Sequence, residues 1–313
     1  MEFSIVICTY NPVREILLRA VNSCISQTVK ADTYEIIIID NNSLLPLSAL
    51  DYIKAILKNN CNVTLHQEKT QGLIHARING IQKTNSQTII FVDDDNVLEN
   101  SYLENLKSLL KNYEQVAIWG PGQIEPDYVN GVPKWIEKHF SGLYQKKNKT
   151  ETRFGCEIEW TDYYPAGSGL VVLKKVLVKY INDFKNGKVS AIGRKGNELS
   201  SAEDSQIIWT AIKMGYSVGT SPVLKLTHII PGNRTNLNYL KKLNYGISNS
   251  YYKALTEMFP DYILKYKKRN IISKIALGWR MLLKAKMDPL LCYRLYKVEN
   301  SWLKGYDDYL TNL

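Results

Sequence analysis

Two short runs of β-branched and aromatic residues constrain the fold of this 313-residue chain more than any other feature. They are residues 35–40 (EIIIID) and residues 88–92 (TIIFV). Such runs are typical of buried strands, and a nearly unbroken apolar run fits a parallel sheet that is covered on both faces. Each run leads into aspartate, so these strands are expected to present carboxylates at their carboxyl ends.

The surrounding sequence alternates between strand and helix patterns. Residues 3–8 and 63–65 read as further strands, whereas apolar residues in 17–25, 52–57 and 73–81 recur at helical spacing. This alternation predicts an open α/β sheet, in which ligands bind at the carboxyl ends of the strands. No GxGxxG motif follows the first strand and no P-loop is present, which disfavours a dinucleotide fold and a P-loop NTPase.

The composition limits the classes of partner and compartment. A net charge of +10 suggests an anionic partner. The five cysteines lack CxxC spacing and favour thiols in a reducing cytoplasm. No apolar stretch approaches the ~18 residues of a membrane span, and the N-terminus does not look like a signal peptide. We therefore expect a cytoplasmic protein, with the inner face of the cell membrane as a candidate location.

Three consecutive carboxylates follow the strand at 88–92. Asp93, Asp94 and Asp95 would repel one another at pH 7 unless a cation lay among them. Hard oxygen ligands suit Mg²⁺ or Mn²⁺, and Mg²⁺ usually shares its coordination with phosphate oxygens. The alternative is an acidic turn that only solubilises the end of the strand.

Four motifs in the first ~120 residues carry a resemblance to a known family. They are residues 4–11 (SIVICTYN), 36–43 (IIIIDNNS), 72–80 (GLIHARING) and 91–95 (FVDDD). In this order and spacing they resemble family-2 glycosyltransferases of the GT-A fold, of the type that builds bacterial surface polysaccharides. The resemblance implies a Rossmann-like, mostly parallel central sheet flanked by helices, and a nucleotide-sugar donor. Two positions, Asn41 and Ile78, depart from the family's pattern.

The resemblance also implies roles for individual residues. The residues expected to hold the nucleotide are Thr9, Tyr10 and Asp40 at the base, Arg77 nearby, and Asp93 or Asp94 at the ribose. Asp95 is expected to bind the metal at the diphosphate, with Asp93 as a second candidate ligand. Structural alternatives exist: a strand-end turn at Thr9 and Tyr10, a helix cap at Asp40, and a solvated surface position for Arg77.

The middle of the chain gives weaker signals. Turn residues interrupt residues 120–150, and 146–149 (KKNK) read as an exposed, mobile loop beside the site. Residues 157–160 (EIEW) alternate like a strand. The small residues at 165–169 (PAGSG) precede the strand at 170–173 and would let a backbone or ligand come close.

Glu203 and Asp204 precede a helical pattern and match the family's Glu-Asp motif. An inverting transfer needs a carboxylate that removes the proton of the attacking acceptor hydroxyl, and we prefer Asp204 over Glu203 for this role. The alternative is a capping box formed by Ser201 and Asp204. His228 ends the strand at 223–228 and is a candidate for contact with metal or diphosphate, although a lone histidine is usually structural.

The tail at 236–313 is rich in basic and aromatic residues. One helical stripe combines Ile271, Ile272, Ile275, Trp279, Leu282 and Leu283. A Trp-bearing apolar stripe among basic residues is typical of a helix at the interface of an anionic membrane. The alternative is a helical subdomain that packs this stripe against the catalytic core.

The sequence thus predicts a GT-A domain at 1–235 and a basic helical region at 236–313. The predicted function is a metal-dependent (Mn²⁺ or Mg²⁺), inverting, hexosyltransferase-like enzyme with a UDP-sugar donor and a glycan or lipid-linked glycan acceptor. One alternative is a nucleic-acid-binding protein, which only the basic aromatic tail supports. Another is a family member that binds the donor without turning it over.

Overall fold

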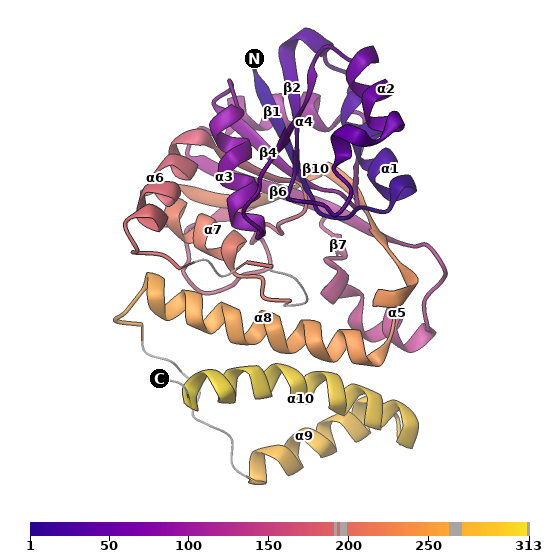
Figure 1. Cartoon of the computed structure of the whole chain (residues 1–313). Helices are drawn as coiled ribbons and strands as arrows, with labels where there is room; N and C mark the ends of the chain where they lie inside the picture. Colours follow the sequence, from indigo (N-terminus) through magenta and orange to yellow (C-terminus); the bar gives the residue numbers. More distant parts are fainter. Residues whose placement is uncertain (191–192, 195–198, 263–270, 312–313) are drawn as a thin grey trace. The chain divides into compact units, whose positions relative to one another are not determined.

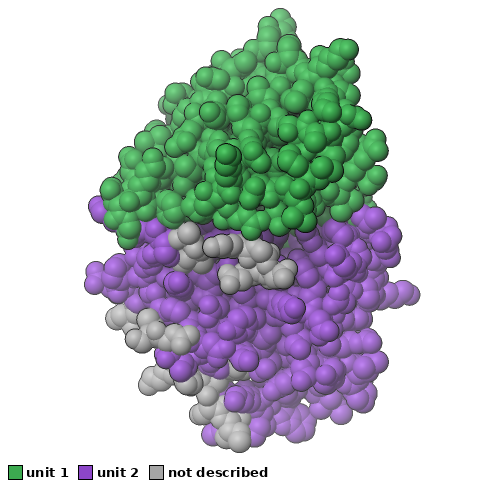
Figure 2. Space-filling view, in the orientation of Figure 1, with its two compact units in different colours: residues 1–127, 145–187, 207–229 green, residues 128–144, 188–206, 230–313 purple. Residues whose placement is uncertain are grey.

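The computed structural model of the protein describes residues 1–190, 193–194, 199–262 and 271–311 (Figure 1). These residues form a ten-stranded sheet with helices around it, in the order β3-β2-β1-β4-β9-β6-β10-β5, with β7 paired to β6 and β8 to β10. The expected α/β class is confirmed. The chain falls into two compact units, each discontinuous in sequence (Figure 2).

The first four strands along the chain form the parallel half of the sheet. They are β1 (Phe3–Thr9), β2 (Tyr34–Asp40), β3 (Val63–Gln67) and β4 (Thr88–Asp93). The helices between them are α1 (Arg14–Ile25), α2 (Asp51–Asn59) and α3 (Leu73–Lys83). In the register of β1 with its neighbours, Thr9 pairs with Asp40 and Cys8 with Asp93. The strands β1, β2 and β4 therefore end at the same edge of the sheet.

The other half of the sheet is mixed, as a mostly parallel sheet allows. It contains β5 (Asn96–Leu98), β6 (Val116–Tyr128), β7 (Lys147–Asn148), β8 (Arg153–Gly155), β9 (Leu170–Leu173) and β10 (Ser217–Ile230). β9 is antiparallel to both β4 and β6, and β10 is antiparallel to β5 and β8. β6 and β10 are also neighbours, and the bonds from the N–H of Ser217 to the Gln115 carbonyl and from the N–H of Val129 to the Ile230 carbonyl run in the sense of a parallel pair.

The remaining helices are α4 (Tyr102–Asn112), α5 (Lys134–Phe140), α6 (Lys174–Lys185), α7 (Glu203–Lys213), α8 (Leu237–Met258), α9 (Ile271–Lys284) and α10 (Pro289–Thr311). Short 3-10 helices lie at Ala31–Thr33, Leu47–Ala49, Ser141–Tyr144 and Gly232–Arg234. None of the helices in the described parts of the chain is long and apolar enough to cross a membrane.

Unit 1 consists of Met1–Asp127, Gln145–Gly187 and Ile207–Ile229. Both faces of its central strands are buried, as the isoleucine run predicts: Ile36, Ile37, Ile38 and Ile39 are all at most 1% exposed. Gly80 lets α3 approach this sheet closely, because a Cβ there would lie 2.5 Å from Cγ1 of Val6. The packing of α3 on β1 fixes the helix that carries Arg77.

Unit 2 consists of Tyr128–Tyr144, Lys188–Gln206 and Ile230–Leu313. In its core, Ile136 and Phe140 of α5 and Ile230 pack with Leu240 of α8 and Leu295 of α10. The expected helical C-terminal region is present. The division into 1–235 and 236–313 stays a prediction, since the two compact units follow different boundaries.

Candidate functional site

The carboxyl ends of β1 and β4 bring several predicted site residues together within unit 1. The Thr9 hydroxyl donates a hydrogen bond to a carboxylate oxygen of Asp94. The turn after β4 is held by the backbone N–H of Asp93, which donates to Oδ1 of Asn96 at 3.3 Å. The strand pattern fixes where β4 ends, and the turn then directs the three aspartates to different partners.

Asp95 lies beside His228. Antiparallel pairing of β5 with β10 sets Asn96 opposite His228, and the N–H of Ile229 donates to the Asp95 carbonyl at 2.8 Å. Nε2 of His228 lies 3.6 Å from Oδ1 of Asp95, and both side chains are about one-tenth exposed (11% and 10%). Nδ2 of Asn96 donates to the same Asp95 oxygen at 3.1 Å. The structure therefore places two of the predicted metal ligands side by side.

The chemistry of this pair fits a divalent cation that shares its coordination with a ligand. Carboxylate oxygens suit Mg²⁺ and Mn²⁺, imidazole suits the first-row transition metals, and Mg²⁺ is usually held by one or two carboxylates plus substrate phosphates. Within the described residues, no three His, Cys, Asp or Glu side chains are grouped so as to hold an ion by themselves. Asp95 and His228 can supply part of a coordination shell that phosphate oxygens would complete.

Asp40 closes the loop that follows β2. Its Oδ1 accepts from the N–H of Ser43 at 3.0 Å and its Oδ2 from the N–H of Leu47 at 2.9 Å, and the residue is 2% exposed. The same loop is tied to the end of β1, because the N–H of Asn11 donates to Oγ of Ser43. Asp40 therefore shapes the edge beside Thr9, and its contact with a base stays a prediction.

Tyr10 and Arg77 occupy contrasting environments. Tyr10 is 44% exposed at the end of β1, where its ring is open to a ligand. Arg77 is 3% exposed, and its guanidinium carbon lies 4.9 Å from the centre of the Phe91 ring. The alternative of a solvated surface position for Arg77 is wrong, because α3 turns this residue onto the sheet.

Ser168, from the small-residue segment at 165–169, is a neighbour of the aspartates. Its Oγ lies within hydrogen-bonding distance, 3.4 Å, of Oδ2 of Asp93. The chain turns sharply next to it at Gly169, which has φ +67° and whose added Cβ would lie 2.7 Å from Leu226. The turn at Gly169 thus lets the Leu226 side chain come close and sets Ser168 against Asp93.

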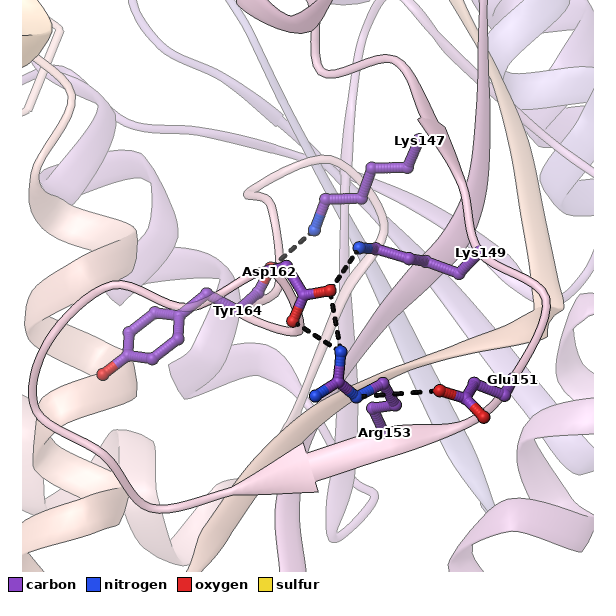
Figure 3. Close-up of polar contacts among 6 residues, drawn as sticks. All are labelled: Lys147, Lys149, Glu151, Arg153, Asp162 and Tyr164. Carbon is purple, nitrogen blue, oxygen red and sulfur yellow. Dashed lines mark hydrogen bonds and ion pairs between the residues drawn. The ribbon is translucent and has the colours of Figure 1, made fainter.

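A cluster of charged side chains anchors the segment before Ser168 (Figure 3). Nζ of Lys147 donates to the Tyr164 carbonyl at 2.5 Å, and Nζ of Lys149 and Nη1 of Arg153 both donate to Asp162. The hydrogen bond from Lys149 lowers the pKa of Asp162. Burial, and secondarily the charge of Lys149, lowers the pKa of Lys147 to about 8.

The prediction of an exposed, mobile loop at 146–149 is therefore wrong for Lys147. This residue lies in β7 and its side chain is largely buried against Tyr164. A signal was present in the sequence: Lys147, Lys149, Glu151 and Arg153 are charged at every second position, the spacing of one face of a strand.

The strand predicted at 157–160 is also absent from the structure. The backbone there bends, and the Ile158 carbonyl accepts from Nε1 of Trp209 and from the Tyr164 hydroxyl, both at 3.0 Å. Side chains thus take the place of a neighbouring strand, and the extended pairing lies instead at Arg153–Gly155.

Glu203 and Asp204 lie in the first turn of α7, in unit 2, whereas the other predicted site residues lie in unit 1. Glu203 is 2% exposed, and a Cβ at Gly193 would lie 2.9 Å from its Oε2. Asp204 is less deeply buried. The assignment of a catalytic base to this pair stays a prediction.

Comparison with known proteins adds the family. A sequence model described as Glycosyl transferase family 2 matches residues 4–170. Polypeptide N-acetylgalactosaminyltransferase 11 of Xenopus tropicalis is 28% identical over 118 residues, which are 37% of this chain and 20% of that protein. Inactive polypeptide N-acetylgalactosaminyltransferase-like protein 5 of Mus musculus is 28% identical over 117 residues, which are 36% of this chain and 27% of that protein.

The chain thus aligns with only about a quarter or less of the length of these curated relatives. Among solved structures, residues 1–349 of S. aureus TarS match with a TM-score of 0.51 and 17% identity, over 100% of this chain and 92% of that one. At this identity the likeness bears on the fold alone, and the expected GT-A fold is confirmed. Because the family model covers more than half of the sequence, the chain belongs to glycosyltransferase family 2.

Proposed function

We propose that this protein transfers a sugar from a nucleotide-diphosphate donor, UDP-linked, to a hydroxyl of an acceptor, with inversion at the anomeric carbon. The observation that carries the proposal is the pairing of Thr9 with Asp94 and of Asp95 with His228, at the ends of β1 and β4 and where β5 pairs with β10. This edge of an α/β sheet is where ligands bind. The name of the Xenopus relative, an N-acetylgalactosaminyltransferase, supports a hexosyl group as the sugar that is transferred.

Each residue at the edge has a role in holding the donor. The exposed ring of Tyr10 and the loop tied by Asp40 would frame the base, with Arg77 behind them on α3. Asp93 or Asp94 would accept hydrogen bonds from the ribose hydroxyls, and Thr9 orients Asp94 for this contact. Side chains that are already fixed by the protein lose little conformational freedom when the donor binds.

The metal site of the proposal consists of Asp95 and His228, with Asp93 as a further candidate ligand. A bound Mn²⁺ or Mg²⁺ would neutralise charge on the departing diphosphate. The hydrogen bond from Asn96 holds the Asp95 carboxylate in place beside His228, so the two ligands do not have to be ordered at the moment of binding.

Asp204 is the proposed general base, with Glu203 as the alternative. A base must reach the acceptor hydroxyl, and Asp204 is more accessible than Glu203. The proposed acceptor is a hydroxyl of a surface glycan or of a lipid-linked glycan. Its support is the family resemblance together with the basic C-terminal region.

A thermal-shift panel of UDP, GDP, dTDP and CMP, with and without Mn²⁺, tests the donor site. A ligand at a hundredfold excess over its Kd stabilises the native state by about 2.7 kcal/mol. For a chain of this size that corresponds to a rise in Tm of roughly 5 °C. We expect this rise with UDP and Mn²⁺ together, and little change with either alone.

The matched variants for this test are Asp95→Asn and Glu114→Gln, which each remove one carboxylate charge. Glu114 lies exposed in a turn, so its variant should keep the metal-dependent response. Asp95→Asn should lose the metal-dependent response. An unchanged response in Asp95→Asn would overturn the metal assignment, and no response to any nucleotide would overturn the donor site.

A second candidate is a family member that binds the donor without turnover, which the name of the inactive Mus musculus relative favours. Release of UDP from UDP-sugars, followed with added glycan acceptors, separates the two. Turnover that is abolished in Asp204→Asn while the nucleotide-induced shift is kept would support catalysis. Nucleotide binding without release of UDP from any donor and acceptor would favour the second candidate.

A further inference from the structure

One face of α9 consists of apolar side chains that nothing in the described structure covers. Ile272, Ile275, Trp279 and Leu283 are 70%, 57%, 63% and 71% exposed. Their spacing of three, four and four residues sets them along a single side of the helix. A soluble surface seldom presents such a row, and contiguous exposed apolar patches usually mark an interaction site.

The opposite face of α9 already holds the helix in unit 2. Leu277, Met281 and Ala285 are at most 4% exposed and pack with Leu295 and Val298 of α10. α9 lies along α10, which in turn lies along α8 (Figure 1). The helix is therefore held in unit 2 by its other face, and the four exposed side chains take no part in that packing.

The apolar surface continues beyond the end of α9. Met287, Leu290 and Tyr293 are 65%, 57% and 52% exposed. Of the seventeen large hydrophobic side chains that are exposed in the described part of the chain, seven thus lie between residues 272 and 293. This concentration distinguishes the surface, which we call the α9 face, from the scattered apolar residues found on any protein.

Basic residues accompany the α9 face. Residues 271–297 contain six lysines and arginines against one acidic residue, Asp288. Lys274, Arg280, Lys284 and Lys286 are exposed, and Nζ of Lys284 lies 3.7 Å from Oε1 of Glu299 on α10. The surface is thus both apolar and positively charged.

We infer that the α9 face docks on an anionic lipid surface. The apolar side chains enter the boundary between headgroups and acyl chains, with Trp279 at the level of the headgroups, where tryptophan is enriched. The basic residues lie against the anionic headgroups. A second copy of this chain fits less well, because self-association would bring two basic surfaces together. The inference does not depend on the proposed transfer reaction, since docking needs no donor.

Flotation with lipid vesicles tests this inference on the full chain. The vesicles are phosphatidylcholine alone or phosphatidylcholine with about a third phosphatidylglycerol. We expect the protein to float with the anionic vesicles and to remain largely unbound with the neutral ones. Each basic residue near such a surface contributes about a fivefold change in partitioning, so Arg280→Gln should weaken binding by that factor.

Two pairs of substitutions test whether vesicle binding depends on the α9 face or on any exposed apolar side chain. Trp279→Ala and Trp160→Ala each remove a tryptophan that is 63% exposed, and Leu283→Ala and Leu44→Ala each remove an exposed leucine. Trp160 and Leu44 lie in unit 1, outside the α9 face. The substitutions at 279 and 283 should lower binding about tenfold or more, and those at 160 and 44 should leave it unchanged.

Three outcomes would overturn the inference. The first is no binding to anionic vesicles. The second is binding that the substitutions at 160 and 44 weaken as much as those at 279 and 283. The third is a dimer, detected by light scattering, that Leu283→Ala dissociates while vesicles do not bind; this result would assign the α9 face to a second copy of the chain.

Discussion

At the residue scale, the positions of the acids were predictable, but most of their neighbours were not. A strand pattern that ends in Asp93 fixes that residue at the sheet edge, and the register with β1 follows from parallel pairing. The contact between Lys147 and the Tyr164 carbonyl joins residues 17 positions apart, and no local pattern reports on it. The sequence shows that a lysine is charged in solution, but it does not show which lysine folding will remove from water.

Lys147 gives a pH prediction. An ordinary lysine has a pKa of 10.5, whereas the pKa of Lys147 in the folded protein is about 8. Between these values the unfolded chain binds more protons than the native state, so the free energy of unfolding rises with pH. Below pH 8 both states are protonated and this contribution is constant.

The measurement is urea unfolding of the wild type and of Lys147→Met at pH 7.5 and 9.5, where the thiols and tyrosines that begin to ionise contribute equally to both proteins. Between pH 7.5 and 9.5 we expect the free energy of unfolding to rise by about 1–2 kcal/mol more in the wild type than in the variant. Lys146→Met is the matched control, because Lys146 is exposed and pairs with Glu125. Equal pH slopes in the wild type and Lys147→Met would contradict the prediction.

At the element scale, the alternating strands and helices before residue 98 were predictable from periodicity, whereas β6 was not. Pro121, Gly122 and Pro126 are turn signals, yet they lie inside this thirteen-residue strand. The glycine is needed because a Cβ there would lie 2.6 Å from the carbonyl carbon of Ser221 on β10. A residue that permits a close strand contact and a residue that permits a turn look the same in a sequence.

The crossing of α8 and α10 gives a prediction at the same scale. A Cβ at Gly305 would lie 2.6 Å from the Tyr245 carbonyl oxygen and 3.1 Å from Cβ of Ser248. Gly305→Ala should therefore push the helices apart and lower the free energy of unfolding by about 1–3 kcal/mol.

Gly278 in α9 is the matched control, because a Cβ there meets nothing within 4 Å in the described structure. Gly278→Ala should stabilise the protein by roughly 0.5–1 kcal/mol, the ordinary preference of a helix for alanine. Thermal and urea unfolding of both variants measure the difference. Equal effects of the two substitutions would show that the helices are not closely packed at Gly305.

At the scale of the whole molecule, the change in composition near residue 236 was visible in the sequence, but the partners of the tail were not. Ile136, Phe140, Tyr144 and Ile230 precede residue 236, and each is at most 6% exposed within unit 2. Their packing partners include Leu240, Leu277 and Leu295, which follow it. Contacts across such long separations leave no periodic signal.

A fragment of residues 1–235 should therefore fail as an independent domain. Removal of the tail would expose these four side chains, so we expect aggregation or strong binding of the dye ANS, together with a lower Tm. The control is the full chain with a protease site inserted after residue 235, compared before and after cleavage and separation. A monomeric fragment that melts like the full chain would instead establish 1–235 as a domain.

The path of the chain between the two units also bears on how this protein can change over evolutionary time. Unit 2 is assembled from three separate stretches of sequence, and both α7 and β10 begin in one unit and end in the other. A recombination event that exchanged only the last 80 or so residues would import helices without the α5 segment on which they pack. New acceptor or surface preferences are therefore expected to arise by substitution in place, not by the exchange of a C-terminal cassette.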